Sequence, residues 1–304
     1  MKRVFVTGGS GFIGKHLISK LTGMNNVITN YDTEQGSNIN VNNVVGDILD
    51  FDKVMYHLKG HDTVCHLAAM VGVVKCQANE GLMYQINYEG LENIVKACHD
   101  SNVKKFVFAS SSEVYGEGGV GCIFDEYAQL APKSMYGKAK RDAELYIMSS
   151  FKNASILRYS NIYGPQQRYD FVVPAFIITA IMGHPLTICG DGEQVRCFTY
   201  ISDAVEGTVK ALEHDEDSYE VYNITSGKPT SNISLSKIIC NLCNNTCEPY
   251  FLKYEELRRD PSVEIKHRIL LPAKAEERLN FSSKTSLYNG LQHTIAHYKK
   301  ELAV

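Results

Sequence analysis

Two side chains four positions apart, Tyr136 and Lys140, have the clearest potential for chemistry in this chain. Residues at this spacing share one face of a helix, so the lysine ammonium is expected to lower the pKa of the phenol. Such a phenol can accept a hydroxyl proton while the carbon gives up a hydride. The run Ser111-Ser112-Glu113 completes the predicted catalytic group, with a serine hydroxyl that relays or holds the proton.

The start of the chain predicts a binding site for a dinucleotide. The β-forming residues 4–6 lead into Gly8-x-x-Gly11-x-x-Gly14, and apolar residues then recur at helical spacing. Glycines let the backbone approach a pyrophosphate closely, and the N-terminus of the helix attracts its charge. The spacing differs from the common Gly-x-Gly-x-x-Gly pattern, and a turn that merely packs a helix on a strand is the alternative.

An acidic residue at the end of the second predicted strand indicates which dinucleotide binds. Asp32 lies 18 residues after Gly14 and follows the strand 27–31. A carboxylate at this place hydrogen-bonds the adenosine ribose hydroxyls and repels a 2′-phosphate, which favours NAD over NADP. Asp47 and Ile48 follow a third strand and are expected to border the adenine ring.

The elements that position these residues alternate between strands and helices. Apolar strands at 62–69 and 105–109 flank a helix with an apolar face over residues 91–98. This alternation predicts a parallel sheet with right-handed crossovers, in which ligands bind at the carboxyl ends of the strands. The catalytic serines follow one such end directly. His66 lies within a strand and is interpreted as a core histidine.

Composition narrows the class of protein. The chain has 304 residues and a formal net charge of −3, with no long run of Lys or Arg, so neither nucleic acid nor a membrane surface is indicated as a partner. We find no signal-peptide pattern and no apolar stretch of bilayer length, which favours a cytoplasmic location. Nine cysteines fit reduced thiols. Cys240, Cys243 and Cys247 could share a helix face, but no fourth ligand is evident, and no metal is expected.

Together, these motifs resemble the extended short-chain dehydrogenase/reductase family, and more narrowly its NAD-dependent nucleotide-sugar epimerase, dehydratase and decarboxylase branch. The resemblance continues through residues 157–165, 190–203 and 268–275, so it covers nearly the whole chain. It implies an α/β fold: a Rossmann-type, doubly wound parallel sheet in residues 1–165, with segment 196–213 packing back onto it. Residues 166–304 would mainly form a smaller lobe that binds the nucleotide sugar.

The resemblance also implies roles for individual residues. Tyr159 would approach the nicotinamide, Asn161 the substrate diphosphate, and the guanidinium groups of Arg196 and Arg268 would hold that diphosphate. Ser112 and Glu113 would contact the substrate as well. The full set of expected NAD contacts is Gly8, Gly11, Phe12, Ile13, Gly14, Asp32, Asp47, Ile48, Leu67, Ala68, Ala69, Asn87, Ser110, Tyr136, Lys140 and Tyr159.

Members of this branch share a first step, oxidation of the sugar at C4 by bound NAD⁺. In this chain, Tyr136 occupies the position of the catalytic base. Dehydratases carry an Asp-Glu pair where this chain has Ser112 and Glu113, so elimination of water is disfavoured. UDP-glucuronate decarboxylases carry a hydroxyl residue before Ser-Glu, as here, but many sequences that resemble epimerases share this triplet. The loop 166–173 also lacks the Asp-Gly-Arg pattern of the decarboxylases.

We therefore expect a nucleotide-sugar 4-epimerase. A decarboxylase and a C4 dehydrogenase that releases the ketosugar are the alternatives, and a catalytically silent NAD sensor is the alternative from another class. The resemblance further implies a homodimer through helices at 90–98 and 138–148.

Overall fold

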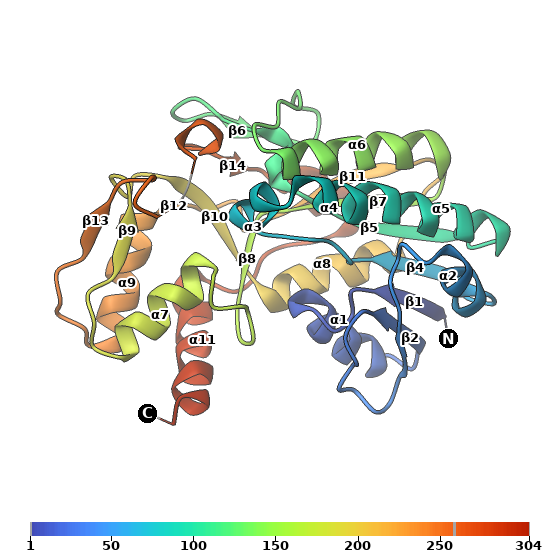
Figure 1. The fold of residues 1–304 in the computed structure, drawn as a ribbon, viewed down its shortest axis with the longest axis horizontal. Coiled ribbons are helices and arrows are strands. Elements are labelled where there is room, and N and C mark those ends of the chain that lie inside the picture. Colours follow the sequence, from blue (N-terminus) through green and yellow to red (C-terminus); the bar gives the residue numbers. More distant parts are fainter. Residues whose placement is uncertain (1, 258–259, 304) are drawn as a thin grey trace.

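A computed structural model describes residues 2–257 and 260–303, and it is built around one large sheet (Figure 1). The sheet has seven strands in the order β11-β7-β5-β4-β1-β2-β3, and every neighbouring pair is parallel. This topology confirms the predicted Rossmann-type fold. The strands are β1 (Arg3–Thr7), β2 (Val27–Asp32), β3 (Asn42–Val45), β4 (Thr63–His66), β5 (Lys105–Ser111), β7 (Ala154–Tyr159) and β11 (Glu220–Ile224).

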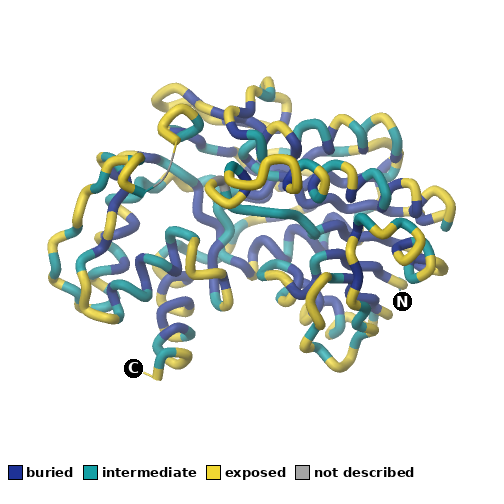
Figure 2. Tube along the Cα trace, viewed as in Figure 1, coloured by how far each residue is buried: buried dark blue, intermediate teal, exposed yellow. Residues whose placement is uncertain are grey.

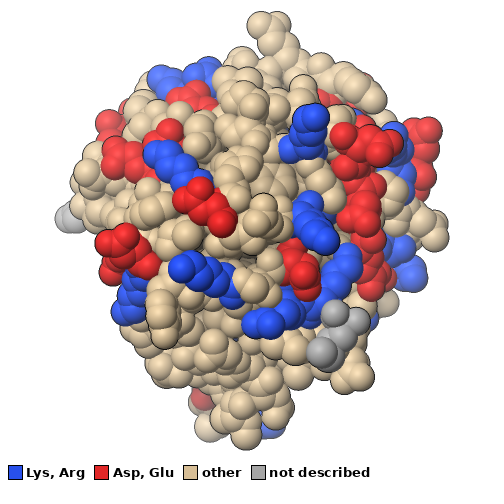
Figure 3. All heavy atoms as spheres, turned by 90° about the vertical axis from the view of Figure 1, so that its right-hand side faces the viewer, with Lys and Arg blue, Asp and Glu red and all other residues tan. Residues whose placement is uncertain are grey.

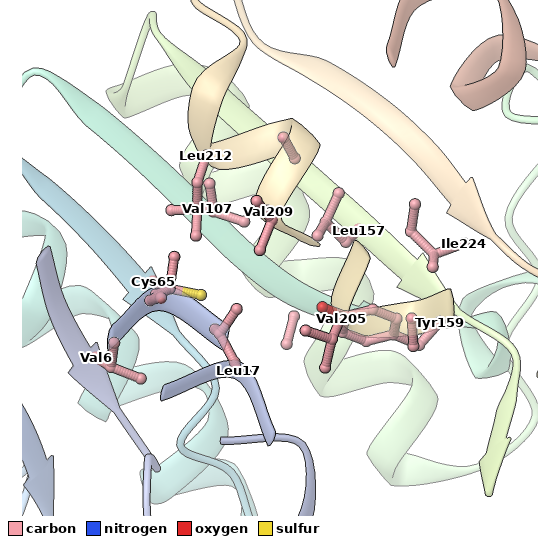
Figure 4. Close-up of a cluster of buried hydrophobic side chains, with 14 of the residues drawn as sticks. Val6, Leu17, Cys65, Val107, Leu157, Tyr159, Val205, Val209, Leu212 and Ile224 are labelled. Carbon is pink, nitrogen blue, oxygen red and sulfur yellow. The ribbon is translucent and has the colours of Figure 1, made fainter. Parts of the chain in front are cut away.

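Helices cover both faces of this sheet, because each central strand is apolar on both sides. One face carries α1 (Phe12–Thr22), α8 (Ile201–Glu213) and α10 (Ala273–Leu279). The other carries α2 (Phe51–Leu58), α5 (Gly90–Asp100) and α6 (Met135–Ser150). Figure 4 shows the first interface, where Leu17 of α1 and Val205 and Val209 of α8 point toward the strands. Apart from the edge strand β3, the strands are accordingly buried along most of their length (Figure 2).

Short helices fill the connections at the carboxyl ends of the central strands. After β4 come α3 (Val73–Ala78), α4 (Glu80–Tyr84) and a π-helical turn, η1 (Gln85–Glu89), which continues into α5. After β5 comes a 3₁₀ turn, η2 (Ser112–Tyr115), and then the short strand β6 (Ile123–Phe124). The predicted catalytic run therefore begins where β5 ends.

The smaller lobe has its own core, formed mainly by three helices and short strands. Its small sheets are β12-β10-β8 and β13-β9, and a third sheet, β14-β6, joins it to the large domain. The elements are β8 (Asn161–Tyr163), α7 (Val172–Ile181), β9 (Thr187–Cys189), β10 (Val195–Tyr200), β12 (Pro229–Ser231), α9 (Asn232–Cys243), β13 (Tyr250–Leu252), η3 (Pro261–Val263), β14 (Ile269–Leu270) and α11 (Leu287–Glu301).

The chain passes between the two parts more than once. β10 lies in a small sheet, but α8 follows it directly and packs against α1 and the large sheet. β11 then pairs with β7 as the seventh strand, which the sequence patterns did not indicate. The predicted domain boundary at residue 165 thus stays a prediction, while the large domain takes elements from much later in the chain.

Three further features bear on the expectations from composition. α9 ends at Cys243, and Asn244 adopts a left-handed conformation, so Cys247 lies beyond the helix that we expected it to share. Within residues 2–257 and 260–303, no group of three or more His, Cys, Asp or Glu side chains is arranged to hold a metal ion. No helix in the same ranges is long and apolar enough to cross a bilayer. On the face shown in Figure 3, basic and acidic side chains are interspersed.

Candidate active site

The three glycines of the turn between β1 and α1 have two different roles. Gly8 and Gly14 are required by close backbone packing, whereas Gly11 leaves open space. Gly8 has φ +72°, and a Cβ atom there would lie 2.6 Å from the Ala68 nitrogen. A Cβ at Gly14 would lie 2.3 Å from the Gly8 oxygen, so both positions need glycine for the fold itself. At Gly11 a Cβ would meet only the Gly8 oxygen, at 3.2 Å. Space therefore remains over the start of α1, where a pyrophosphate would fit.

Acidic residues stand at the ends of β2 and β3, as expected. The Asp32 carboxylate accepts the backbone N–H of Ser10 at 2.9 Å and that of Glu34 at 3.0 Å. These bonds fix the carboxylate beside the glycine turn, where the adenosine ribose is expected. Asp47 is exposed in the next loop, and Ile48 is buried against Gly90 of α5.

Asn87 holds the loop that follows β4. It is buried in the π-helical turn, and its side chain accepts the Met70 N–H at 2.8 Å and donates to the Met70 carbonyl at 3.0 Å. The loop backbone at Leu67, Ala68 and Ala69 is thereby kept against the glycine turn. Asn87 was predicted as a cofactor contact, and this contact stays a prediction.

Tyr136 and Lys140 lie on one face of α6, as the spacing predicts, but the electrostatics differ from our expectation. Burial raises the pKa of Tyr136, the thiol of Cys76 adds to this, and a hydrogen bond from Ser111 opposes it. The Lys140 ammonium donates to the Ala109 carbonyl at 2.8 Å, and only 2% of Lys140 is exposed. Burial lowers the pKa of Lys140 to about 8. The net pKa of the phenol is thus raised where we expected it to be lowered, because desolvation dominates.

Glu113 of the serine-serine-glutamate run forms an ion pair with a buried arginine, Arg268. Its carboxylate lies 2.7 Å from Nη2 of Arg268, and Ser134 Oγ donates to it at 3.4 Å. Burial alone would raise the pKa of Glu113, but Arg268 and Ser134 outweigh it and lower the pKa. Ser112, beside it, is buried as well. Glu113 and Arg268 both act electrostatically on Tyr136, which places the ion pair at the catalytic group.

The two predicted diphosphate ligands, Arg196 and Arg268, lie near each other but are held differently. Arg196 donates to the Ile265 carbonyl at 2.5 Å, and burial followed by repulsion from Arg268 lowers the pKa of Arg196 to about 10. Arg268 is 4% exposed, and within the part of the chain that the structure describes its Nε and Nη1 have no hydrogen-bond partner. Buried donors without partners are costly, so this site fits an anionic ligand.

Three other predicted residues lie at the ends of β5 and β7. The Ser110 hydroxyl donates to Glu144 of α6, behind the catalytic group. The Tyr159 hydroxyl lies 2.6 Å from Thr208 Oγ1, and its ring packs in the core with α8 (Figure 4). Asn161 begins β8 and pairs with Phe198 of β10. Their predicted contacts with NAD or substrate remain predictions.

The structure adds Cys76 to the site. It is buried on α3, its Sγ donates to the Met70 carbonyl at 3.5 Å, and it packs with Tyr136. The loop that carries it meets the loop 166–171 through Arg168, which donates to the Val71 carbonyl at 3.4 Å. No motif singles out Cys76, and only its place in the segment that follows β4 could have indicated a role.

Comparison with known proteins agrees with this geometry. A model of the NAD dependent epimerase/dehydratase family matches residues 4–225. The UDP-N-acetyl-alpha-D-glucosaminuronate decarboxylase of Bacillus cytotoxicus is 32% identical, over 98% of this chain and 98% of that protein.

Two solved structures are similar over nearly the whole chain. The UDP-glucose 4-epimerase of Thermotoga maritima with UDP-glucose has a TM-score of 0.90 and 30% identity, covering 99% of both chains. The UDP-glucuronic acid 4-epimerase of Bacillus cereus, in complex with UDP-glucuronic acid and NAD, has a TM-score of 0.88 and 28% identity, covering 98% of this chain and 99% of that one.

Proposed function

Because the chain belongs to the NAD-dependent epimerase/dehydratase family, we propose that it is a nucleotide-sugar 4-epimerase acting on a UDP-sugar. The observation that carries the proposal is that α6 brings Tyr136 and Lys140 to the end of β5, where the Lys140 ammonium donates to the Ala109 carbonyl and Ser111 follows two residues later. A hydroxyl, a phenol and an ammonium so arranged can remove and return the proton of a sugar hydroxyl. The similar epimerases of known structure were solved with UDP-sugars, which supports the nucleotide.

NAD is the cofactor of this enzyme. The residues present fit it, since Gly11 leaves room for the pyrophosphate and Asp32 presents a carboxylate beside the turn. Bound NAD⁺ supplies the acceptor for a hydride from C4 of the sugar.

The side chains of the chain handle the proton. Tyr136 Oη would accept the proton of the C4 hydroxyl, and Ser111 would orient that hydroxyl through its own hydrogen bond. Since burial raises the pKa of the phenol, positive charge must stabilise the phenolate when it forms. Lys140 and Arg268 are the cations of the chain that supply it.

Ser112 favours epimerisation over elimination. It occupies the place where dehydratases of the family carry an aspartic acid, and it is buried beside Glu113. A serine hydroxyl is too weak an acid to protonate a departing C6 hydroxyl. The sugar would therefore keep its oxygen atoms, and return of the hydride to the other face of C4, with return of the proton to the C4 oxygen, would give the epimer.

Decarboxylation is the second candidate, and Arg268 is the observation that favours it. Two of its guanidinium nitrogens have no hydrogen-bond partner among the described residues, and beside Glu113 they could hold a carboxylate on C5 of the sugar. The similarity to a UDP-N-acetyl-alpha-D-glucosaminuronate decarboxylase points the same way.

The test is to incubate the purified protein with a panel of UDP-, dTDP-, CDP- and GDP-sugars, including uronic acids, and to follow products by proton NMR and mass spectrometry. An isomer of unchanged mass from a UDP-sugar is the expected result. Loss of carbon dioxide from a uronic acid would establish the decarboxylase instead. Loss of two hydrogens would indicate a dehydrogenase that releases its ketosugar, and loss of water would contradict the role given to Ser112. A protein that binds NAD but leaves every sugar unchanged would favour a sensor.

We also propose a homodimer formed through α5 and α6. Beside them, Tyr84 of α4 stacks on Tyr88 of η1, the turn that leads into α5, and Tyr146 of α6 lies edge-on against Tyr88. Leu145 on α6 is more than half exposed. An apolar and aromatic face on two adjacent helices suits packing against its own copy.

A further inference from the structure

A buried row of charges lies behind the catalytic group. Glu144 follows Lys140 by one turn of α6 and is completely buried. Ser110 Oγ donates to its Oε1 at 2.5 Å, and Arg158 of β7 donates from Nη2 to its Oε2 at 2.7 Å and from Nε to its Oε1 at 3.0 Å. Lysine, glutamate and arginine thus form a row with alternating charges.

The position of Glu144 is fixed from several sides. Arg158 Nη1 donates to Tyr115 Oη at 2.9 Å, and that hydroxyl donates to Asn223 of β11 at 2.7 Å. The arginine is only 3% exposed, so the fork of its guanidinium holds the carboxylate in a dry environment. A carboxylate bound in this way cannot turn toward another partner without breaking several hydrogen bonds.

The remaining neighbours of Lys140 do not compensate its charge at neutral pH. Its Nζ lies 4.7 Å from the centre of the Phe108 ring. His66, from β4, is kept neutral because burial and Lys140 lower its pKa to about 3. The thiol of Cys76, from α3, is protonated because burial raises its pKa to about 11, and Tyr136 on α6 is neutral for the same reason. Within the described residues, Glu144 is the carboxylate that acts on Lys140.

We propose that Glu144 is a positioning residue for the reaction proposed above: fixed by Ser110 and Arg158 one helical turn from Lys140, its carboxylate keeps Lys140 an ammonium and, through Ser110, fixes the strand end that binds Lys140. The Lys140 ammonium donates to the carbonyl of Ala109, and Ser110, the next residue, binds Glu144. The end of β5 is therefore hydrogen-bonded to α6 at two adjacent residues, Ala109 and Ser110. Without the carboxylate, two cations would remain together in a region of low dielectric constant.

The experiment measures the charge of Lys140 directly. Protein labelled with ¹³C at lysine Cε is titrated by NMR, and the Lys140 signal is assigned from its loss in Lys140→Arg. In Glu144→Gln, which keeps the shape of the side chain but removes its charge, we expect the pKa of Lys140 to fall by about one unit. Glu144→Asp should restore most of this shift. Glu277→Gln, an exposed carboxylate on α10, is the matched control and should leave the Lys140 pKa unchanged.

Activity provides a second readout. The alkaline limb of the pH profile of kcat should move down by the same amount in Glu144→Gln, with KM for the sugar changed less than kcat. An unchanged Lys140 titration in folded Glu144→Gln would overturn the proposal. Should that variant unfold because Arg158 is left unpaired, Glu144→Gln/Arg158→Met removes both buried charges, and a smaller fall in the pKa of Lys140 is expected.

The titration needs no sugar and is run with and without NAD. A protein that converts no sugar yet shows the shift in Lys140 would overturn the proposed function and leave the electrostatic role of Glu144 standing. A protein that is active but shows no shift would do the reverse.

Discussion

The buried Arg268 forms an ion pair with Glu113 that uses only part of the guanidinium group. One guanidinium nitrogen lies 2.7 Å from the carboxylate, while Nε and Nη1 have no partner among residues 2–257 and 260–303. A substrate anion could therefore bind Arg268 without displacing Glu113. Such an anion would satisfy donors that are already desolvated, which makes its binding favourable.

Removal of this guanidinium should weaken binding of the substrate. In Arg268→Gln we expect the affinity for UDP to fall about 30-fold, or about 2 kcal/mol, because a charge-assisted contact with the diphosphate is lost. Isothermal titration calorimetry with UDP measures this, and NAD binding should be unaffected. Arg278→Gln, on the exposed side of α10, is the control. If Arg268→Gln bound UDP normally but bound the intact UDP-sugar more weakly, Arg268 would contact the sugar and not the diphosphate.

Tyr136→Phe should abolish turnover and leave NAD bound. The phenol oxygen is the proposed proton acceptor, so we expect a loss of about 10³-fold in kcat. Single-turnover assays with the substrate found in the sugar panel measure the loss, and the nucleotide released on denaturation reports bound NAD. Tyr84→Phe changes a tyrosine on the outer helical surface and should retain activity. Activity within tenfold of the native enzyme in Tyr136→Phe would show that another group is the base.

Alanine at Gly11 should impair NAD binding without unfolding the protein. Its Cβ would meet only the Gly8 oxygen, at 3.2 Å, but would occupy the space left for the pyrophosphate. We expect NAD affinity to fall at least about tenfold while Tm changes little. Gly14→Ala is the contrasting variant, since its Cβ would lie 2.3 Å from the Gly8 oxygen and should lower Tm strongly. Equal NAD affinity in Gly11→Ala and native protein would rule out this route for the pyrophosphate.

The pH profile should reflect the lowered pKa of Lys140. Burial lowers that pKa from 10.5 to about 8, so the ammonium is present below pH 8 and is lost as the pH rises through 8. We expect kcat/KM to fall above about pH 8, in a range where an ordinary lysine stays charged. Lys140→Arg keeps its charge, so whatever activity it retains should stay level up to pH 9.5. A flat native profile over that range would contradict the role given to Lys140.

Leu145→Glu should dissociate the proposed dimer. The side chain is exposed on α6 in the single chain, and a carboxylate there would be buried against the partner. Light scattering after gel filtration should give the mass of two chains for native protein and of one chain for the variant. Tyr127→Glu, at an exposed site in the loop after β6, is expected to remain dimeric. A monomeric native protein would exclude the dimer outright.

Local patterns predicted the fold well. The glycine turn, the acidic end of β2 and the Tyr-x-x-x-Lys spacing each lie within one strand-helix unit, so their geometry follows from residues close in sequence. The seventh strand was missed because β11 is a short apolar run and its partner, β7, lies far from it in the sequence. Pairing between segments so distant in the chain leaves no local signal.

The pKa values of Tyr136 and Lys140 could not be predicted from the spacing of these residues in the sequence. Tyr136 and Lys140 do share a helix face, but the sign of the shift in the phenol pKa depends on how deeply the folded chain buries both groups. Glu144 stands at helical spacing from Lys140, and this was visible in the sequence. Its partner Arg158 comes from a different strand, so only the three-dimensional structure identifies the pair.

The place of β11 in the sheet has a consequence for synthesis of the protein. When residues 1–165 have left the ribosome, six of the seven strands exist and β7 is an unpaired edge. Its neighbour arrives only after α7, β9, β10 and α8 have been translated. During that interval the nascent chain exposes an edge on which other strands can pair. The two parts of the enzyme therefore complete their folding together, late in translation, rather than one after the other.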